Sequence, residues 1–86
     1  MFQSFFLAGF EGSTGFNRHG EWFDQVVATG HDANVDEDYA DIARMGLHAA
    51  RETVRWPLID CRGRYDFSSL VPFIDAANRQ HVGVIW

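Results

Sequence analysis

Several features that mark particular classes of protein are missing or scarce in this sequence of 86 residues. Cys61 is the single cysteine, so no internal disulfide can form. There is no cluster of basic residues and the net charge is −5, which argues against nucleic acid and anionic membranes as partners. No apolar run approaches the roughly 20 residues that a membrane-spanning helix needs.

The start of the chain also lacks the pattern of a secretory signal. The apolar run of residues 5–10 is short, has no cationic leader and is followed at once by Glu11. We therefore expect a cytoplasmic protein. The histidines do not fall at metal-ligand spacings, and no Gly-x-Gly-x-x-Gly pattern follows the first apolar run. We expect neither a bound metal nor another cofactor.

What is present indicates a folded chain. Hydrophobic residues make up 47% of the sequence, which is typical of a globular protein. Residues 5–10 are continuously apolar and predict a first strand that is buried on both faces. Residues 11–34 contain four glycines and no sustained period, which predicts a long loop with a helical turn around residues 22–27.

A first helix is predicted over residues 35–45. Its apolar positions recur at helical spacing, namely Val35, Tyr39, Ile42, Ala43 and Gly46. Asn34 is the expected N-cap, and Glu37 three residues later would complete a capping box. Gly46 can adopt the left-handed conformation that ends a helix.

A second strand is predicted over residues 48–54, and alternation along it separates two sets of side chains. One face would carry Ala49, Arg51 and Thr53, and the other Ala50, Glu52 and Val54. A second helix follows, with an apolar stripe at Leu70, Phe73, Ile74 and Ala77. Ser68 or Ser69 would cap it, with Pro72 in its first turn.

A third strand is predicted over residues 82–86, so the chain alternates strand, helix, strand, helix, strand. This order predicts an α/β fold built as a β-α-β-α-β unit with parallel strands. The last strand is apolar, and a parallel strand of that kind needs neighbours on both sides. We therefore expect residues 1–86 to be a fragment of a larger domain.

Motifs along the chain resemble those of clan A glycoside hydrolases, the (β/α)8 barrel enzymes that include families 1 and 5. Arg51 follows the helix-ending Gly46 by five residues, and Trp56 follows it by ten, which is the spacing of the family's second strand. Residues 63–67 resemble the family's Gly-x-Tyr-Asp-Phe segment, residues 73–76 its second barrel helix, and residues 82–85 its third strand. The likeness covers most of the chain and is nearest to a divergent β-glucosidase-like branch.

The resemblance implies that residues 1–86 are the N-terminal portion of a TIM barrel, with the first three of its eight strands. It implies a retaining hydrolase that acts on O-glycosidic bonds of a carbohydrate substrate. In the family the two catalytic glutamates come from later strands, so no catalytic residue is expected in this chain. Arg51 matches the family arginine that hydrogen-bonds the nucleophile. The alternative for Arg51 is a surface arginine paired with Glu52 or Asp60.

Other residues near the expected carboxyl ends of the strands are candidates for substrate binding. Glu11 could accept hydrogen bonds from sugar hydroxyls or could be a solvated loop carboxylate. Trp56, Trp86 and Trp22 could stack on sugar rings, although buried tryptophans more often fill a core, which is the role we favour for Trp56.

The histidines carry weaker signals. His31 and Asp32 could form a proton relay, but the interpretation we favour is a polar loop in which Asp32 helps the chain enter the helix. His48, at the start of the second strand, is expected to be structural.

Two other functions remain open on the residues alone. One is a stand-alone α/β binding or interaction module, which would have to protect two exposed sheet edges, for example by self-association. The other is a barrel enzyme with different chemistry.

Overall fold

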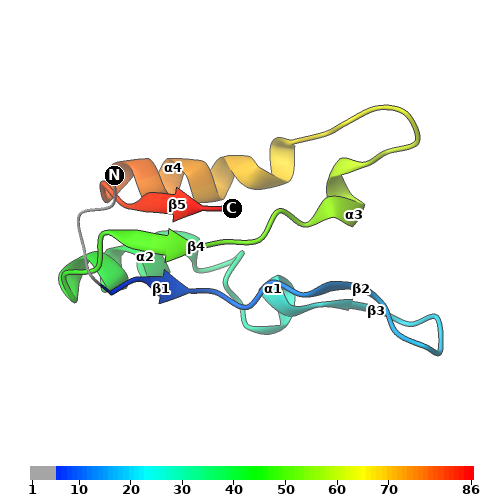
Figure 1. Cartoon of the computed structure of the whole chain (residues 1–86), viewed down its shortest axis with the longest axis horizontal. Helices are drawn as coiled ribbons and strands as arrows, with labels where there is room; N and C mark the ends of the chain where they lie inside the picture. Colours follow the sequence, from blue (N-terminus) through cyan, green and yellow to red (C-terminus); the bar gives the residue numbers. More distant parts are fainter. Residues whose placement is uncertain (1–5) are drawn as a thin grey trace.

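The computed structural model describes residues 6–86. In chain order the elements are β1 (Ala8–Gly9), β2 (Thr14–Phe16), β3 (Trp22–Asp24), α1 (Gln25–Ala28), α2 (Val35–Arg44), β4 (Ala49–Arg51), α3 (Trp56–Ile59), the 3₁₀ helix η1 (Ser68–Leu70), α4 (Val71–Arg79) and β5 (Gly83–Ile85). The protein is a small α/β fold with one parallel sheet and one β-hairpin (Figure 1).

The parallel sheet has the strand order β1-β4-β5, as the sequence predicted. Ala50 is the Cα partner of both Ala8 and Val84, and Arg51 lies between Gly9 and Ile85. Each strand is shorter than predicted, and Phe5 of the predicted first strand lies outside the described residues. Over residues 6–86 the sheet is open and does not close into a barrel.

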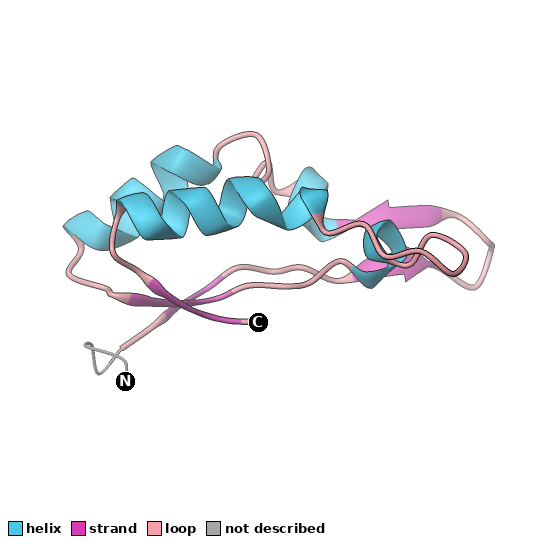
Figure 2. Ribbon diagram, turned by 90° about the horizontal axis from the view of Figure 1, so that it is seen from above, coloured by secondary structure: helices cyan, strands magenta, loops and turns pink. Residues whose placement is uncertain are grey.

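Both long helices, α2 and α4, lie on the same face of this sheet (Figure 2). Because side chains alternate along a strand, the residues that face the helices belong to one set, represented by Ala50 of β4. The hydrophobic core lies between the helices and that face, and its buried members are Val26, Val35, Tyr39, Ile42, Ala50, Phe73, Ala76, Ala77 and Val82. No helix covers the other face within the described part of the chain.

Helix α2 begins at Val35, as predicted, and ends one residue before the predicted end, but its first turn is not capped as predicted. Gly46 follows it with a φ of 78°, which is the left-handed stop expected there. The capping box is wrong: Asn34 has φ −121° and ψ 21°, and its side chain accepts no hydrogen bond from the helix. The Asn34 side-chain amide instead donates a hydrogen bond to the carbonyl of Gly30 at 2.9 Å. The Asn34 side chain therefore belongs to the turn that precedes α2 and does not cap the helix.

Helix α4 also begins without the predicted serine cap. The 3₁₀ helix η1 precedes it directly, so neither Ser68 nor Ser69 stands in the extended conformation that an N-cap needs. Asp66 takes the serine's place one turn earlier, where its carboxylate accepts a hydrogen bond from the Ser68 N–H at 2.9 Å. Pro72 lies in the first turn of α4, as predicted.

The segment predicted as a loop, residues 11–34, contains a β-hairpin. Strands β2 and β3 pair antiparallel, with Phe16 opposite Trp22. The Asn17 side chain closes the turn by accepting hydrogen bonds from the N–H groups of His19 and Glu21, at 2.8 and 3.0 Å. Asp24 then caps α1, which overlaps the helical turn predicted around residues 22–27. The hairpin extends past the carboxyl ends of β1 and β4 (Figure 1).

Candidate functional site

Arg51 lies at the carboxyl end of β4, on the face of the sheet that no described helix covers. Its neighbour Ala50 is fully buried in the core, so the Arg51 side chain must leave the strand on the opposite side. A Cβ atom added to Gly9 would come within 3.2 Å of an Arg51 guanidinium nitrogen. The guanidinium therefore lies over β1, and the absence of a side chain at Gly9 makes room for it.

Glu11 lies two residues beyond the end of β1, within the range at which the charge of this guanidinium acts on its carboxylate. Its carboxylate accepts hydrogen bonds from the N–H and the hydroxyl of Ser13, at 2.9 and 2.7 Å. These bonds lower the pKa of Glu11, and the positive charge of Arg51 lowers that pKa further. An ionised carboxylate and a guanidinium thus share the carboxyl edge of the uncovered face.

Main-chain contacts keep the two strand ends in register beyond the strands themselves. The Phe10 N–H donates to the Arg51 carbonyl at 3.1 Å, and the Glu52 N–H donates to the Ile85 carbonyl at 2.9 Å. Gly12 is buried against Thr53, and a Cβ at Gly12 would overlap the Thr53 side chain. The segments that carry Glu11 and Arg51 are therefore tightly packed together.

Glu52 is directed to the helix-covered side and is not available to pair with Arg51. It is 4% exposed, and one of its carboxylate oxygens accepts from the Tyr39 hydroxyl at 2.8 Å and faces His31 Nε2 at 2.6 Å. Burial, followed by the adjacent Glu52 charge, raises the pKa of Tyr39. Of the two carboxylates proposed as partners of Arg51, Glu52 is thus engaged elsewhere.

His31 was expected in a polar loop, and that interpretation is wrong. The imidazole is 3% exposed, because α1 and the turn after it direct His31 inward between β1 and α2. Its two ring nitrogens face Asp38 and Glu52, each at 2.6 Å, and its ring stacks on Phe10 at 3.8 Å. One local sign of this position was present in the sequence, since His31 lies seven residues before Asp38, an acidic residue of the predicted helix.

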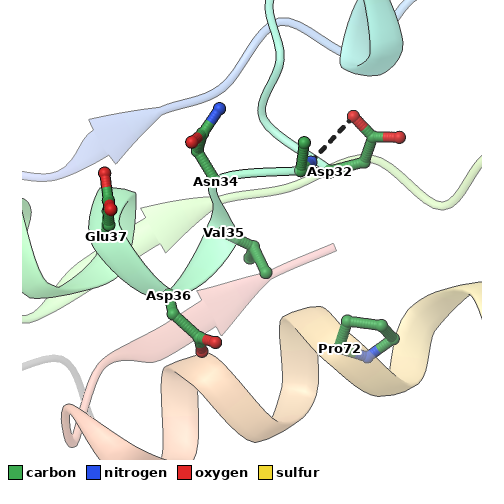
Figure 3. A pocket seen from close by; sticks show the side chains of 7 residues that line it. Asp32, Asn34, Val35, Asp36, Glu37 and Pro72 are labelled. Atoms are coloured by element: carbon green, nitrogen blue, oxygen red, sulfur yellow. Dashed lines mark hydrogen bonds between the residues drawn. The ribbon is translucent and has the colours of Figure 1, made fainter.

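Asp32 is exposed and separate from His31. It lines a surface depression of about 400 Å³ at the start of α2, together with Asn34, Asp36, Glu37 and Pro72 (Figure 3). The carboxylates in Figure 3 point in different directions and do not converge on a common point. The depression lies on the helix side of the molecule and takes no part in the arrangement around Arg51.

Trp56 is not a core residue, contrary to the role favoured from the sequence. It is 52% exposed at the start of α3, and its ring contacts Tyr65, whose centroid lies 5.6 Å away. Phe67 continues this group at 6.4 Å from Tyr65. The reason is topological: α3 lies beyond the carboxyl end of the sheet, where the described residues provide no layer to cover it (Figure 1).

Trp22 and Trp86 are placed differently from each other and from Arg51. Trp22 is on the hairpin and makes an edge contact with Phe16, with centroids 5.3 Å apart, and both rings are exposed. Trp86 follows Ile85, the partner of Arg51, and therefore lies on the helix side. It lines a depression of about 260 Å³ with Ile74, Ala77 and Asn78 of α4. The structure places Glu11 and Arg51 at the same edge of the sheet, where the charge of Arg51 acts on Glu11, but it does not place Trp86 on their face.

Two further observations concern residues 6–86 as a whole. No three His, Cys, Asp or Glu side chains among them are grouped so that they could hold a metal ion. None of their helices is long and apolar enough to cross a membrane. His48 is half-buried at the start of β4, where its carbonyl accepts from the Gly83 N–H at 2.9 Å.

No protein-family model, curated protein or solved structure matches this chain. The function is therefore inferred from the chemistry of the site and from the motif resemblance.

Proposed function

We propose that this chain forms the first three strands of a cytoplasmic, β-glycosidase-like (β/α)8 barrel that hydrolyses O-glycosidic bonds. The observation that supports this most strongly is the position of Arg51, at the carboxyl end of a parallel strand and on the face opposite the helices. In a (β/α)8 barrel that face is the interior, and the carboxyl ends of the strands form the active site.

The arrangement of layers supports the same proposal. Sheets made only of parallel strands are covered on both faces in known folds, whereas β1, β4 and β5 are covered on one. Successive strands lie side by side in chain order, with both crossover helices on the same face, as in a barrel. Further strands would close the uncovered face into an interior lined by Gly9, Arg51 and Ile85.

The role proposed for Arg51 is to position the nucleophilic carboxylate. A guanidinium inside a barrel needs an anionic partner, and a rigid, always-charged donor can hold a carboxylate ionised and oriented for attack on the anomeric carbon. Retaining glycosidases require two carboxyl groups about 5 Å apart. Glu11 and Glu52 lie on opposite sides of the sheet and cannot be that pair, so the proposal places both catalytic glutamates on later strands.

Glu11 and the exposed aromatic residues would bind substrate. The Glu11 carboxylate, kept ionised, can accept hydrogen bonds from sugar hydroxyls at the rim of the cleft. The rings of Trp56, Tyr65 and Phe67 form one exposed group beyond the carboxyl ends of the strands, where the apolar face of a sugar could stack.

The same aromatic group favours a second candidate, a stand-alone carbohydrate-binding module. Exposed apolar patches mark interaction or ligand-binding sites on proteins, whether or not the protein is an enzyme. In this case the uncovered face of the sheet would be closed by another copy of the chain or by a partner.

The test is to express the complete product of the gene and to assay it against a panel of aryl β-glycosides. We expect hydrolysis, and Arg51→Ala should lower kcat by about a hundredfold or more while the circular dichroism spectrum is unchanged. Arg44→Ala is the matched control, because Arg44 is exposed on α2 and pairs only locally with Asp41.

The outcomes separate the candidates. Full activity in Arg51→Ala would remove the role assigned to Arg51. A gene product without hydrolase activity that binds oligosaccharides, and loses that binding in Trp56→Ala, would establish the module. A gene product that neither cleaves glycosides nor binds sugars would contradict both candidates and point to a barrel of other chemistry.

A further inference from the structure

The buried side chains of His31, Glu52 and Tyr39, together with the half-buried Asp38, form a chain of hydrogen bonds between α2, the loop before it and the end of β4. His31 is its centre, with Nδ1 at 2.6 Å from Asp38 and Nε2 at 2.6 Å from Glu52. The Tyr39 hydroxyl donates to the same Glu52 oxygen at 2.8 Å. None of these groups faces the uncovered side of the sheet, so the proposed hydrolase chemistry does not use them.

The geometry decides where the protons are. An ionised carboxylate can only accept hydrogen bonds, and a neutral imidazole can donate from only one nitrogen. A histidine that faces carboxylate oxygens through both nitrogens satisfies both contacts only as an imidazolium, which donates twice. Bonds between charged groups are also the short ones, and both contacts are short.

We infer that His31 is a buried imidazolium that positions the carboxyl ends of β1 and β4, and with them Glu11 and Arg51. Deprotonation of His31 removes one of its two hydrogen bonds and so loosens the two strand ends. His31 contacts the residue next to each of the two: it stacks on Phe10, which precedes Glu11, and it donates to Glu52, which follows Arg51. One side chain from the long loop thus reaches both strand ends.

The charges around the imidazolium agree with this assignment. Asp38 and Tyr39 face it from α2, and Glu52 faces it from the end of β4. Phe73 of α4 covers another side at 5.2 Å, and the Arg55 guanidinium lies beyond that ring, paired with Asp24 at 2.8 Å. With His31 charged, two cations face three carboxylates. A neutral imidazole would leave Arg55 as the one cation for all three.

The pH dependence follows from the same contacts. Burial by itself lowers the pKa of His31, but the hydrogen bonds to Glu52 and Asp38 outweigh it, so the pKa is raised above its ordinary value of 6.5. A pKa that is higher in the folded state means that folding is favoured where the imidazole is protonated. The contribution is complete below about pH 6.5 and is lost as the pH rises through the raised pKa. Between those two values the ratio of folded to unfolded protein should fall by up to about tenfold per pH unit.

The direct test is a titration of the histidine ring nitrogens by ¹⁵N NMR in the complete gene product. We expect both nitrogens of His31 to stay protonated to a higher pH than those of a histidine in an unfolded peptide, whose pKa is about 6.5. A His31 ring that loses its second proton at or below the pH at which such a peptide does so would overturn the inference, even if every variant failed to fold.

A pair of variants tests the consequence. His31→Gln cannot carry the charge, so the fall in stability between pH 6 and 9 measured by urea unfolding should disappear. The matched control is His19→Gln, since His19 is exposed in the hairpin turn, and this variant should keep the wild-type profile. A pH dependence that persists unchanged in His31→Gln would contradict the inference. These readouts do not involve activity, so they stand apart from the hydrolase proposal.

Discussion

The two faces of the parallel sheet differ in how their polar residues are satisfied. On the helix-covered face Glu52 is buried and bonded to two neighbours, and the apolar residues around it form the core. On the other face Arg51 lies exposed over Gly9. The two residues are adjacent in the chain, and the alternation of one strand is what separates them.

This difference distinguishes polar residues that stabilise the fold from polar residues that remain available to bind a ligand. A buried polar group must find its partners within the protein, because an unpaired one costs about 1–3 kcal/mol or more. A polar group on an uncovered face can keep its hydrogen-bonding capacity for a ligand. Glu52 and Arg51 would look alike in any scale of residue polarity, and only their sides of the sheet distinguish them.

The largest expected effect is therefore on the covered face. Glu52→Ala leaves His31 and the Tyr39 hydroxyl buried without their shared acceptor, and it should lower the free energy of unfolding by about 3–5 kcal/mol. Arg51→Ala should change that free energy by less than about 0.5 kcal/mol, because nothing buried depends on it. Urea unfolding followed by circular dichroism compares the two. Equal losses of unfolding free energy in the two variants would mean that Arg51 is as important to the fold as Glu52.

A smaller effect is expected where a buried ion pair is compared with a surface pair. Arg55 and Asp24 are both less than a tenth exposed and lie 2.8 Å apart. Arg55→Met would leave Asp24 uncompensated and should cost about 3 kcal/mol. Arg44→Met removes an exposed partner of Asp41 and should cost less than about 1 kcal/mol. Thermal unfolding at one salt concentration gives both free-energy changes. A larger loss of stability in Arg44→Met than in Arg55→Met would contradict the greater importance assigned to the buried pair.

The smallest of the three effects concerns the contact between the two strand ends. Gly12→Ala would force a Cβ into the Thr53 side chain and should cost about 1–3 kcal/mol through overpacking. Thr53→Gly removes the obstructing atoms, so the double variant should lose less stability than the sum of the single variants. If the losses of unfolding free energy in this double-mutant cycle are strictly additive, the Cβ at position 12 does not clash with the Thr53 side chain.

Much of the regular structure could be predicted from the sequence. The spacing of Val35, Tyr39 and Ile42 predicted α2 almost to the residue, and the parallel order of three strands followed from the alternation of elements. The hairpin of β2 and β3 was missed because Thr14–Phe16 is only three residues long and contains Gly15. Its turn is closed by the side chain and the main chain of Asn17, which leave no periodic signal.

The site was predictable in part. The side of the sheet on which Arg51 lies follows from alternation, and its proximity to Glu11 follows from the rule that parallel strands end at one edge. The exposure of Trp56 was not predictable, because it depends on whether a layer covers α3. The role of His31 was also missed, since its two partners lie 7 and 21 residues away along the chain.

The sequence by itself determined the order of the three parallel strands and their two long helices, the side chains that each of these strands offers to either face, and the end of α2 before Gly46, because these depend on local periodicity and backbone conformation. Only the tertiary structure decided that both helices cover one face, that His31 lies between Asp38 and Glu52, and that Arg51 is left on the open side. Those facts depend on contacts between residues distant in the chain, and the buried His31 and Glu52 find their hydrogen-bond partners through such contacts.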